Sequence, residues 1–340
     1  MGANIFWKPD KALILDFMHK YVKDFDEKLD YSNWHYVKDF TKNCKYMSDE
    51  YFKDIELMNK LNSAIDKFQL TYYPTFDDES EEERIVLSNK PTIFLYWHQG
   101  KDCLPSLQQL CYDRLNQKCS NDFNIILLDR FSIKDYISIP DFIENAMQEK
   151  RMWLQHYVDY IRISLLAKYK AIWFDATVFV KDDLKDIDFD YDFWSIKCKD
   201  MYVDTWAKDV IPQMNKCQIY AMGGNSSYFY KCMKSLIEYH FKHFNVAYSY
   251  YIMYYMAEYL YKTNRKIKQQ FDDLDYNNEH VECFTNKRAL QIEEIKKMWN
   301  CIDDTHIFKL LKFDNANDAA NDAYKIFLFC KDIYEKDKEQ

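Results

Sequence analysis

The stretch AIWFDATVFV at residues 171–180 combines a strand-like composition with one carboxylate at its centre, Asp175. Alanine, threonine, β-branched and aromatic residues make up the rest, and such side chains suit a pleated, half-buried surface. Burial of an unpaired carboxylate costs free energy, so the fold must give Asp175 a partner or end the strand at this point. The residues alone leave open whether one strand continues through Asp175 or stops early and turns at Asp-Ala-Thr.

Two other short apolar runs, at 91–100 and 123–130, alternate with segments of helical pattern at 104–115 and 138–170. Short runs of this kind predict strands, and strands that alternate with helices favour an α/β fold with a substantial parallel sheet. Farther along, 219–244 predicts a strand, a Gly-Gly turn and a helix, and the chain then stays mainly helical.

The N-terminal part has a different pattern, because apolar residues recur at helical spacing between about residues 11 and 70. The acid-rich segment 71–84 predicts an exposed loop. We therefore expect a helical N-terminal region at 1–88 and a second domain, with a helical C-terminal extension, at 89–340. The most apolar stretch, 249–261, is too short to span a bilayer and predicts a buried helix.

Composition excludes several classes of function. The net charge of −9 argues against nucleic acid as a partner, since that role requires a basic face. The ten cysteines are scattered singly and no secretory segment precedes them, which is typical of reduced thiols in an intracellular protein.

Motifs for phosphate-binding loops, serine hydrolases, zinc proteases and dinucleotide binding are missing from the sequence. The two histidines of HFKH at 240–243 are interpreted as a surface feature rather than a metal site.

Polar residues follow the predicted strands at their carboxyl ends, where open α/β sheets bind ligands. These candidates are Trp97, His98, Gln99, Asp129, Asp175 and Thr177. If 171–180 is extended throughout, Asp175 and Thr177 point to the same face, about 6–7 Å apart.

The helix before that stretch contributes a second candidate pair. Asp159 and Arg162 are three residues apart and lie on the flank of an apolar stripe. Pattern alone favours an ordinary ion pair on a helix surface, and such pairs contribute little to stability.

Four strings resemble the capsular polysaccharide synthesis glycosyltransferases, relatives of the family 32 sugar transferases. They are YWHQG at 96–100, ILLD at 126–129, DYISIPDFI at 135–143 and DYIRISLLAKYKAIWFDATVF at 159–179. The resemblance runs from about residue 91 to 260. It implies an A-type glycosyltransferase (GT-A) fold, in which a Rossmann-like sheet flanked by helices holds a nucleotide-sugar donor, most simply a UDP-sugar.

The resemblance also implies roles for single residues. Asp175 would open an Asp-x-Asp motif that reaches the donor diphosphate through Mn²⁺ or Mg²⁺, with Thr177 as a further ligand. Asp159 would accept hydrogen bonds from sugar hydroxyls, and Arg162 would contact the sugar or a phosphate. The donor-binding set expected from the resemblance and from the strand ends is Tyr96, Trp97, His98, Gln99, Asp129, Gly223 and Gly224, with Trp97 near the nucleobase.

This chain departs from the family pattern at several positions. Thr177 stands where the wider superfamily has a second carboxylate, although Asp-Ala-Thr is typical of the capsular branch itself. Lys170-Ala171 replaces Gly-Gly, and Val158 replaces serine. In SYYIMY at 249–254, Ser249 and Tyr254 occupy the positions of two acids.

The implied activity is a retaining transfer of a sugar to a polysaccharide or lipid-linked glycan, in the cytoplasm or in peripheral association with the inner face of the membrane. A sugar-phosphate transferase and a catalytically silent relative that binds a glycan or a partner protein are the alternatives.

Overall fold

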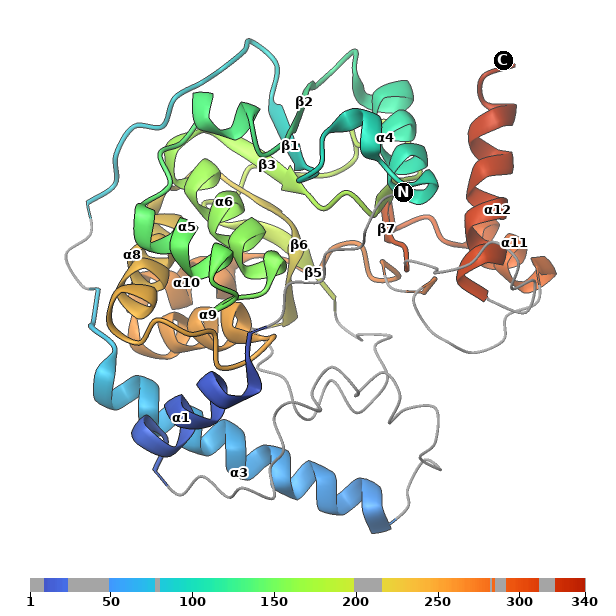
Figure 1. The fold of residues 1–340 in the computed structure, drawn as a ribbon. Helices are drawn as coiled ribbons and strands as arrows, with labels where there is room; N and C mark the ends of the chain where they lie inside the picture. Colours follow the sequence, from blue (N-terminus) through green and yellow to red (C-terminus); the bar gives the residue numbers. More distant parts are fainter. Residues whose placement is uncertain are drawn as a thin grey trace.

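The computed structural model describes residues 9–23, 49–76, 80–198, 216–281, 283–284, 292–311 and 322–339. It is a mixed α/β structure in which helices flank a central sheet of five strands (Figure 1). The strand order is β2-β1-β3-β6-β5. The strands are β1 (Thr92–Tyr96), β2 (Asn124–Leu128), β3 (Ala171–Phe174), β5 (Trp194–Lys197) and β6 (Cys217–Gly223).

One half of this sheet is parallel and the other half is antiparallel. β1 pairs in parallel with both β2 and β3, whereas β6 pairs antiparallel with β3 and with β5. The predicted strands at 91–100 and 123–130 and the parallel component are therefore confirmed. All residues of β1 and β3 are buried, as expected for central strands covered on both faces.

The stretch 171–180 is two strands rather than one, so the continuous strand is the wrong alternative. β3 ends at Phe174, the chain turns at Asp175–Thr177, and β4 (Val178–Val180) leaves the sheet to pair antiparallel with β7 (Ile307–Lys309). The amide of Asp175 still donates to the Tyr220 carbonyl at 2.8 Å, and the Asp175 carbonyl accepts from the Val178 amide at 2.9 Å. Asp175 and Thr177 are therefore turn residues and do not share one face of a strand.

The helices that flank the sheet are α4 (Ser106–Cys119), α5 (Asp141–Gln148), α6 (Leu154–Lys168), α8 (Tyr228–His243), α9 (Ile252–Thr263) and α10 (Arg265–Asp273), and the first three alternate with strands as predicted. Two further helices, α11 (Ile292–Cys301) and α12 (Asp322–Lys336), lie apart from the sheet (Figure 1). The predicted helical segment 138–170 divides into α5 and α6 at Lys150, whose φ of 57° lies in the left-handed region. Helix α6 is buried over most of its length because it packs against both α8 and β3.

Two N-terminal helices, α1 (Lys11–Tyr21) and α3 (Asp49–Tyr72), lie within the predicted helical region. They join the main hydrophobic core through aromatic contacts. The Phe17 ring stacks on Tyr248 at 5.3 Å between centroids, and Phe68 meets Phe244 edge-on at 5.2 Å. The domain boundary near residue 88 falls in an irregular segment and stays a prediction.

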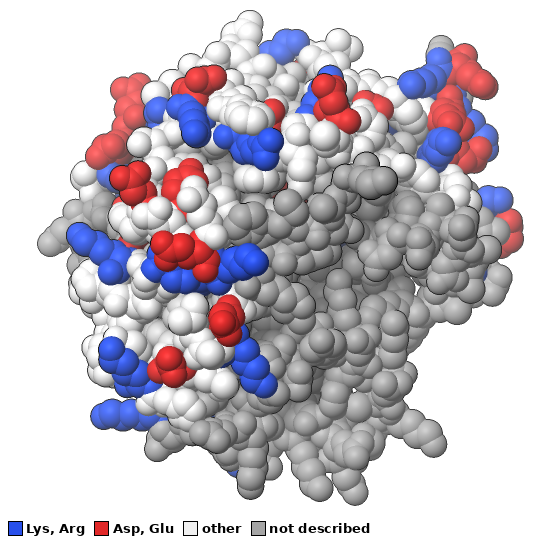
Figure 2. All heavy atoms as spheres, in the orientation of Figure 1, with Lys and Arg blue, Asp and Glu red and all other residues white. Residues whose placement is uncertain are grey.

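A second, smaller core lies between α4, the β4–β7 pair and α12. Phe179 of β4 and Phe308 of β7 are fully buried in it. The buried Arg114 of α4 donates to the Val180 carbonyl and pairs with Asp337 beyond α12 at 2.6 Å. The charged side chains that Figure 2 shows on one face are intermixed in sign across the described residues.

His240 of α8 corrects one prediction, because it is fully buried while His243 is exposed. Its Nδ1 lies 2.9 Å from the Tyr73 hydroxyl and its Nε2 lies 2.8 Å from the Val246 carbonyl. The rings of Phe17 in α1 and of Phe244, directly after α8, lie against the imidazole, a tertiary environment that HFKH alone does not indicate. The predicted buried helix at 249–261 is confirmed as α9. Among the described residues, no helix has the length and apolar content needed to cross a membrane.

The burial of His240 predicts a pH-dependent stability. Burial lowers its pKa from 6.5 to about 4. Between these pH values the unfolded chain binds a proton that the folded chain does not, so folding weakens as the pH falls. Relative to His240→Gln, we expect wild-type protein to lose at most about 3 kcal/mol of unfolding free energy between pH 7 and pH 4. Urea unfolding measures this difference.

His243→Gln, a change on the exposed side of the same helix, provides the control and should track the wild type across the pH range. Groups common to all three proteins cancel in the comparison. If wild type and His240→Gln showed the same pH dependence, the buried imidazole would not be the titrating group.

Candidate active site at the carboxyl end of β3

Asp175 has a partner for each carboxylate oxygen. Its Oδ2 accepts from Lys309 Nζ at 2.7 Å. Its Oδ1 accepts from Trp173 Nε1 at 3.0 Å and lies 3.6 Å from Arg162 Nη1. The side chain is 26% exposed, so this carboxylate is paired yet still reachable from solvent.

Asp159 and Arg162 of α6 form a buried pair, which corrects the surface interpretation. Arg162 Nη2 donates to Asp159 Oδ1, and Arg162 Nη1 donates to the Ile219 carbonyl of β6. Their side chains are 8% and 6% exposed. The guanidinium also lies over the Trp173 ring, 5.3 Å from its centroid. The helix face that carries this pair therefore points at the carboxyl end of β3 rather than at water.

Burial and the neighbouring charges set the ionisation of the two carboxylates. Burial raises the pKa of Asp159 to about 6, and the adjacent Arg162 only partly opposes this shift. Burial alone would also raise the pKa of Asp175, but the positive charges of Lys309 and Arg162 outweigh it and hold that pKa below its usual value. Asp175 is therefore ionised at neutral pH, while Asp159 titrates close to it. Perturbed carboxylates at a strand end are typical of functional sites.

Lys309 was missed by the sequence reasoning. Its only local signal is a lone lysine in the apolar run IFKLL at 307–311, the same anomaly as the aspartate in 171–180 but of opposite charge. The pairing of β7 with β4 sets Lys309 opposite Val178, and the amide of Leu310 donates to the Thr177 carbonyl at 3.0 Å. Strand pairing thus brings the lysine to Asp175.

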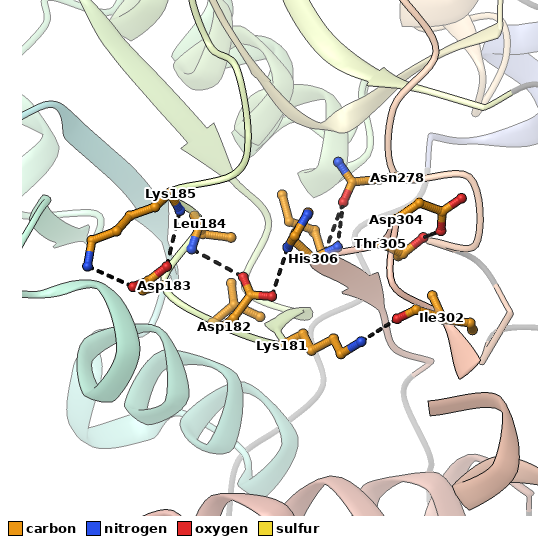
Figure 3. Close-up of polar contacts among 12 residues, drawn as sticks. Lys181, Asp182, Asp183, Leu184, Lys185, Asn278, Ile302, Asp304, Thr305 and His306 are labelled. Carbon is orange, nitrogen blue, oxygen red and sulfur yellow. Dashed lines mark hydrogen bonds and ion pairs between the residues drawn. The ribbon is translucent and has the colours of Figure 1, made fainter. Parts of the chain in front are cut away.

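Polar contacts fix the entry to β7. Asn278 Oδ1 accepts from the amides of His306 and Ile307 at 2.9 and 3.1 Å. Figure 3 shows the side chains of Asp182 and His306 pointing toward one another, with 2.8 Å between Oδ2 and Nδ1. In the same view Lys181 Nζ donates to the Ile302 carbonyl. These contacts hold the strand that carries Lys309.

The predicted metal ligands, Asp175 and Thr177, make a poor donor set for a divalent ion. Thr177 is buried and supplies at most a hydroxyl, and an ammonium group already faces Asp175 Oδ2. Over the part of the chain that the structure describes, no three His, Cys, Asp or Glu side chains gather closely enough to hold a metal. This arrangement does not fit the expected ion, although the metal requirement itself stays a prediction.

Four predicted donor-binding residues, at 96–99, lie at the carboxyl end of β1, and Asp129 follows β2. Both strands run in the same direction as β3 and end at the same edge of the sheet. Tyr96 Oη lies 2.9 Å from His98 Nδ1, and burial lowers the pKa of His98. Trp97 is partly exposed and its Nε1 donates to the Cys103 carbonyl at 3.1 Å, while Gln99 lies in the turn that follows. The shared edge is what a common binding site requires.

Asp129 has structural contacts of its own. Its Oδ1 accepts from the amides of Phe131 and Ser132, each at 2.8 Å, and from the Ser132 hydroxyl at 3.0 Å. The Ser132 amide contributes most to holding the pKa of Asp129 below its usual value. Asp129 therefore orders the start of the short 3₁₀ helix Ser132–Asp135.

Gly223 and Gly224 lie at the other end of β3. A Cβ on Gly223 would come within 3.0 Å of the Ala171 carbonyl oxygen. Gly224 has a φ of 120°, and a Cβ there would lie 2.5 Å from the Asp192 carbonyl oxygen. Both glycines thus permit close backbone packing near the amino end of β3, and their position lends no support to a contact with a ligand at Asp175.

The segment 249–254 has hydroxyl side chains, Ser249 and Tyr254, at the positions of two family acids. Ser249 Oγ accepts from the Tyr251 amide at 3.1 Å, and Tyr254 Oη donates to Gln218 Oε1 at 3.4 Å. Tyr250, which the sequence reasoning did not select, lies close enough for the charges of Asp159 and Asp175 to add to the effect of burial in raising its pKa. This segment therefore borders the charged cluster without adding a carboxylate at either position.

Removal of Arg162 should destabilise the fold, because it leaves the charge of Asp159 buried without a cation. We expect Arg162→Met to lose about 3–5 kcal/mol of unfolding free energy at pH 7.5. The loss should be smaller at pH 5.5, because the pKa of Asp159, already about 6, rises further without its cation and the protonated acid carries no charge. Urea unfolding at the two pH values tests this.

The double variant Asp159→Asn/Arg162→Met is the matched control, since it removes both charges and should remove the extra pH dependence. An equal cost of Arg162→Met at both pH values would show that packing, rather than charge, dominates the pair.

No curated protein and no solved structure matches the chain. One family model does match, over residues 43–327, and it describes a capsular polysaccharide synthesis protein. The match includes α3, the whole sheet and the β4–β7 pair, and so contains all four charged residues of the cluster. The chain belongs to the capsular polysaccharide synthesis protein family.

Proposed function

We propose that this protein is a glycosyltransferase that transfers a sugar from a nucleotide-sugar donor, most simply a UDP-sugar, to a polysaccharide or lipid-linked glycan. It would act in the cytoplasm or at the inner face of the membrane. Family membership supports a transferase role in capsule synthesis. The observation that carries the proposal is the buried Asp159–Arg162 pair beside the partly exposed Asp175, at the sheet edge where α/β folds bind ligands.

The chemistry of donor cleavage suits this cluster. A departing nucleoside diphosphate accumulates negative charge, and fixed cations near it stabilise the transition state. Arg162 is held by Asp159 and by a backbone carbonyl of β6, so it is oriented before any ligand arrives. Asp159 can accept hydrogen bonds from sugar hydroxyls in its ionised form. Retention of configuration and a GT-A identity for the sheet belong to the same proposal.

A catalytically silent relative is the second candidate. Ser249 and Tyr254 stand at the positions of two family acids, and their hydroxyls serve as a backbone cap and as a partner of Gln218. Such a protein would bind a glycan or another protein without turnover. A sugar-phosphate transferase is distinguished by its product, which would contain a phosphodiester.

A thermal-shift panel of UDP-, GDP- and CMP-sugars, with and without Mn²⁺, tests donor binding, since a ligand of the folded state raises the melting temperature. We expect one nucleotide class to stabilise the protein. Glycosyl transfer from that donor to a capsular glycan acceptor should fall by about 100-fold or more in Asp175→Asn, because the cations of the cluster lose their anchor. The same panel tests the predicted divalent ion.

Asp183→Asn is the matched control, because Asp183 pairs with Lys185 on the surface of the segment after β4. Its transfer rate should equal that of wild type. Binding of a donor without transfer to any glycan would favour the silent relative, and no stabilisation by any donor would refute the proposal.

A further inference from the structure

We infer that Lys309 takes the place of a divalent cation at the donor diphosphate, with Asp175 as the residue that positions it. This inference rests on the proposed function and deepens it, because it identifies the cation beside Asp175 as a side chain of the protein. The binding step would then need no metal ion.

The carboxylate of Asp175 is already committed on both sides. Oδ2 is 2.7 Å from Lys309 Nζ, which is the length of a charge-assisted hydrogen bond. Oδ1 is shared between Trp173 Nε1 and the Arg162 guanidinium. A divalent ion bound directly to this carboxylate would have to displace one of these cations or lie beside it against charge repulsion.

The neighbouring ligand position points the same way. Thr177 offers a neutral hydroxyl, which is a weaker ligand for a hard cation than a carboxylate. Its backbone carbonyl is taken by the Leu310 amide, the residue directly after Lys309. The turn that would hold an ion is therefore joined to the strand that delivers the ammonium group.

Lys309 has the geometry to bind an anion while it stays paired. An ammonium group has three N–H donors, and Asp175 accepts one of them. The side chain is 21% exposed and its Nζ lies over the Tyr220 ring, 5.0 Å from the centroid. The pairing of β7 with β4 and the contacts of Asn278 hold its backbone. A diphosphate can therefore approach a cation that is already oriented.

Isothermal titration of UDP and of GDP, in EDTA and in Mn²⁺, tests the inference on wild type, Lys309→Met and Lys309→Arg. We expect wild type to bind one nucleoside diphosphate in EDTA within about threefold of its affinity in Mn²⁺. Lys309→Met should lower that affinity by at least about tenfold in either buffer, which is the effect expected for one charged hydrogen bond. Lys309→Arg should recover most of it.

Two further variants separate a binding effect from a folding effect. Lys309→Met/Asp175→Asn leaves no unpaired carboxylate, and it should fold while still binding weakly. Lys181→Met changes the lysine directly after β4, whose Nζ donates to the Ile302 backbone carbonyl, and it should bind like wild type.

Binding that requires Mn²⁺ and survives in Lys309→Met would overturn the inference and leave the proposed function intact. Failure of wild type to bind either nucleoside diphosphate in both buffers would refute the inference together with a UDP- or GDP-sugar donor, while stabilisation by a CMP-sugar in the thermal-shift panel would keep the proposed transferase function.

Discussion

The pairing of Asp175 with Lys309 and Arg162 is the interaction on which the architecture around the site depends. A carboxylate at the end of a buried strand requires cations, and here they come from α6 and from β7, which is distant in sequence. To reach Lys309 the chain must leave the five-stranded sheet after Asp175 and run as β4 beside β7. The turn at Asp175–Thr177 and the pairing of β4 with β7 thus together bring the carboxylate and the ammonium group into contact.

The cluster is a poor source of stability, and its arrangement is better explained by the proposed chemistry. A buried ion pair seldom stabilises a fold more than apolar residues of the same volume would, because desolvation offsets the Coulomb attraction. Asp159 and Arg162 are nevertheless buried on α6, where an apolar pair would avoid the free-energy cost of desolvating two charges. In the proposed function their value is orientation, since a cation already fixed by a carboxylate and a backbone carbonyl would need no rearrangement when a charged ligand binds.

The strands and the parallel half of the sheet could be predicted, because they depend on the local pattern of apolar residues. The runs that became β1, β2 and β3 are continuous apolar segments bounded by helices, and the parallel half of the sheet followed from that alternation. The partners of Asp175 could not be derived, because a lysine in an apolar run reveals nothing about which distant strand it will face. His240 was misjudged for the same reason: its burial comes from rings of α1, far away in sequence.

Thr177 and Lys309 are two sides of one arrangement. The Thr177 carbonyl accepts from the amide of Leu310, so a hydrogen bond joins the turn to the strand that carries the ammonium group. A second carboxylate at 177 would draw that ammonium away from Asp175 or compete for a metal ion. Threonine carries no charge and therefore does not compete with Asp175 for the ammonium group. The departure from the Asp-x-Asp pattern is therefore consistent with a site in which a lysine, held by strand pairing, supplies the positive charge.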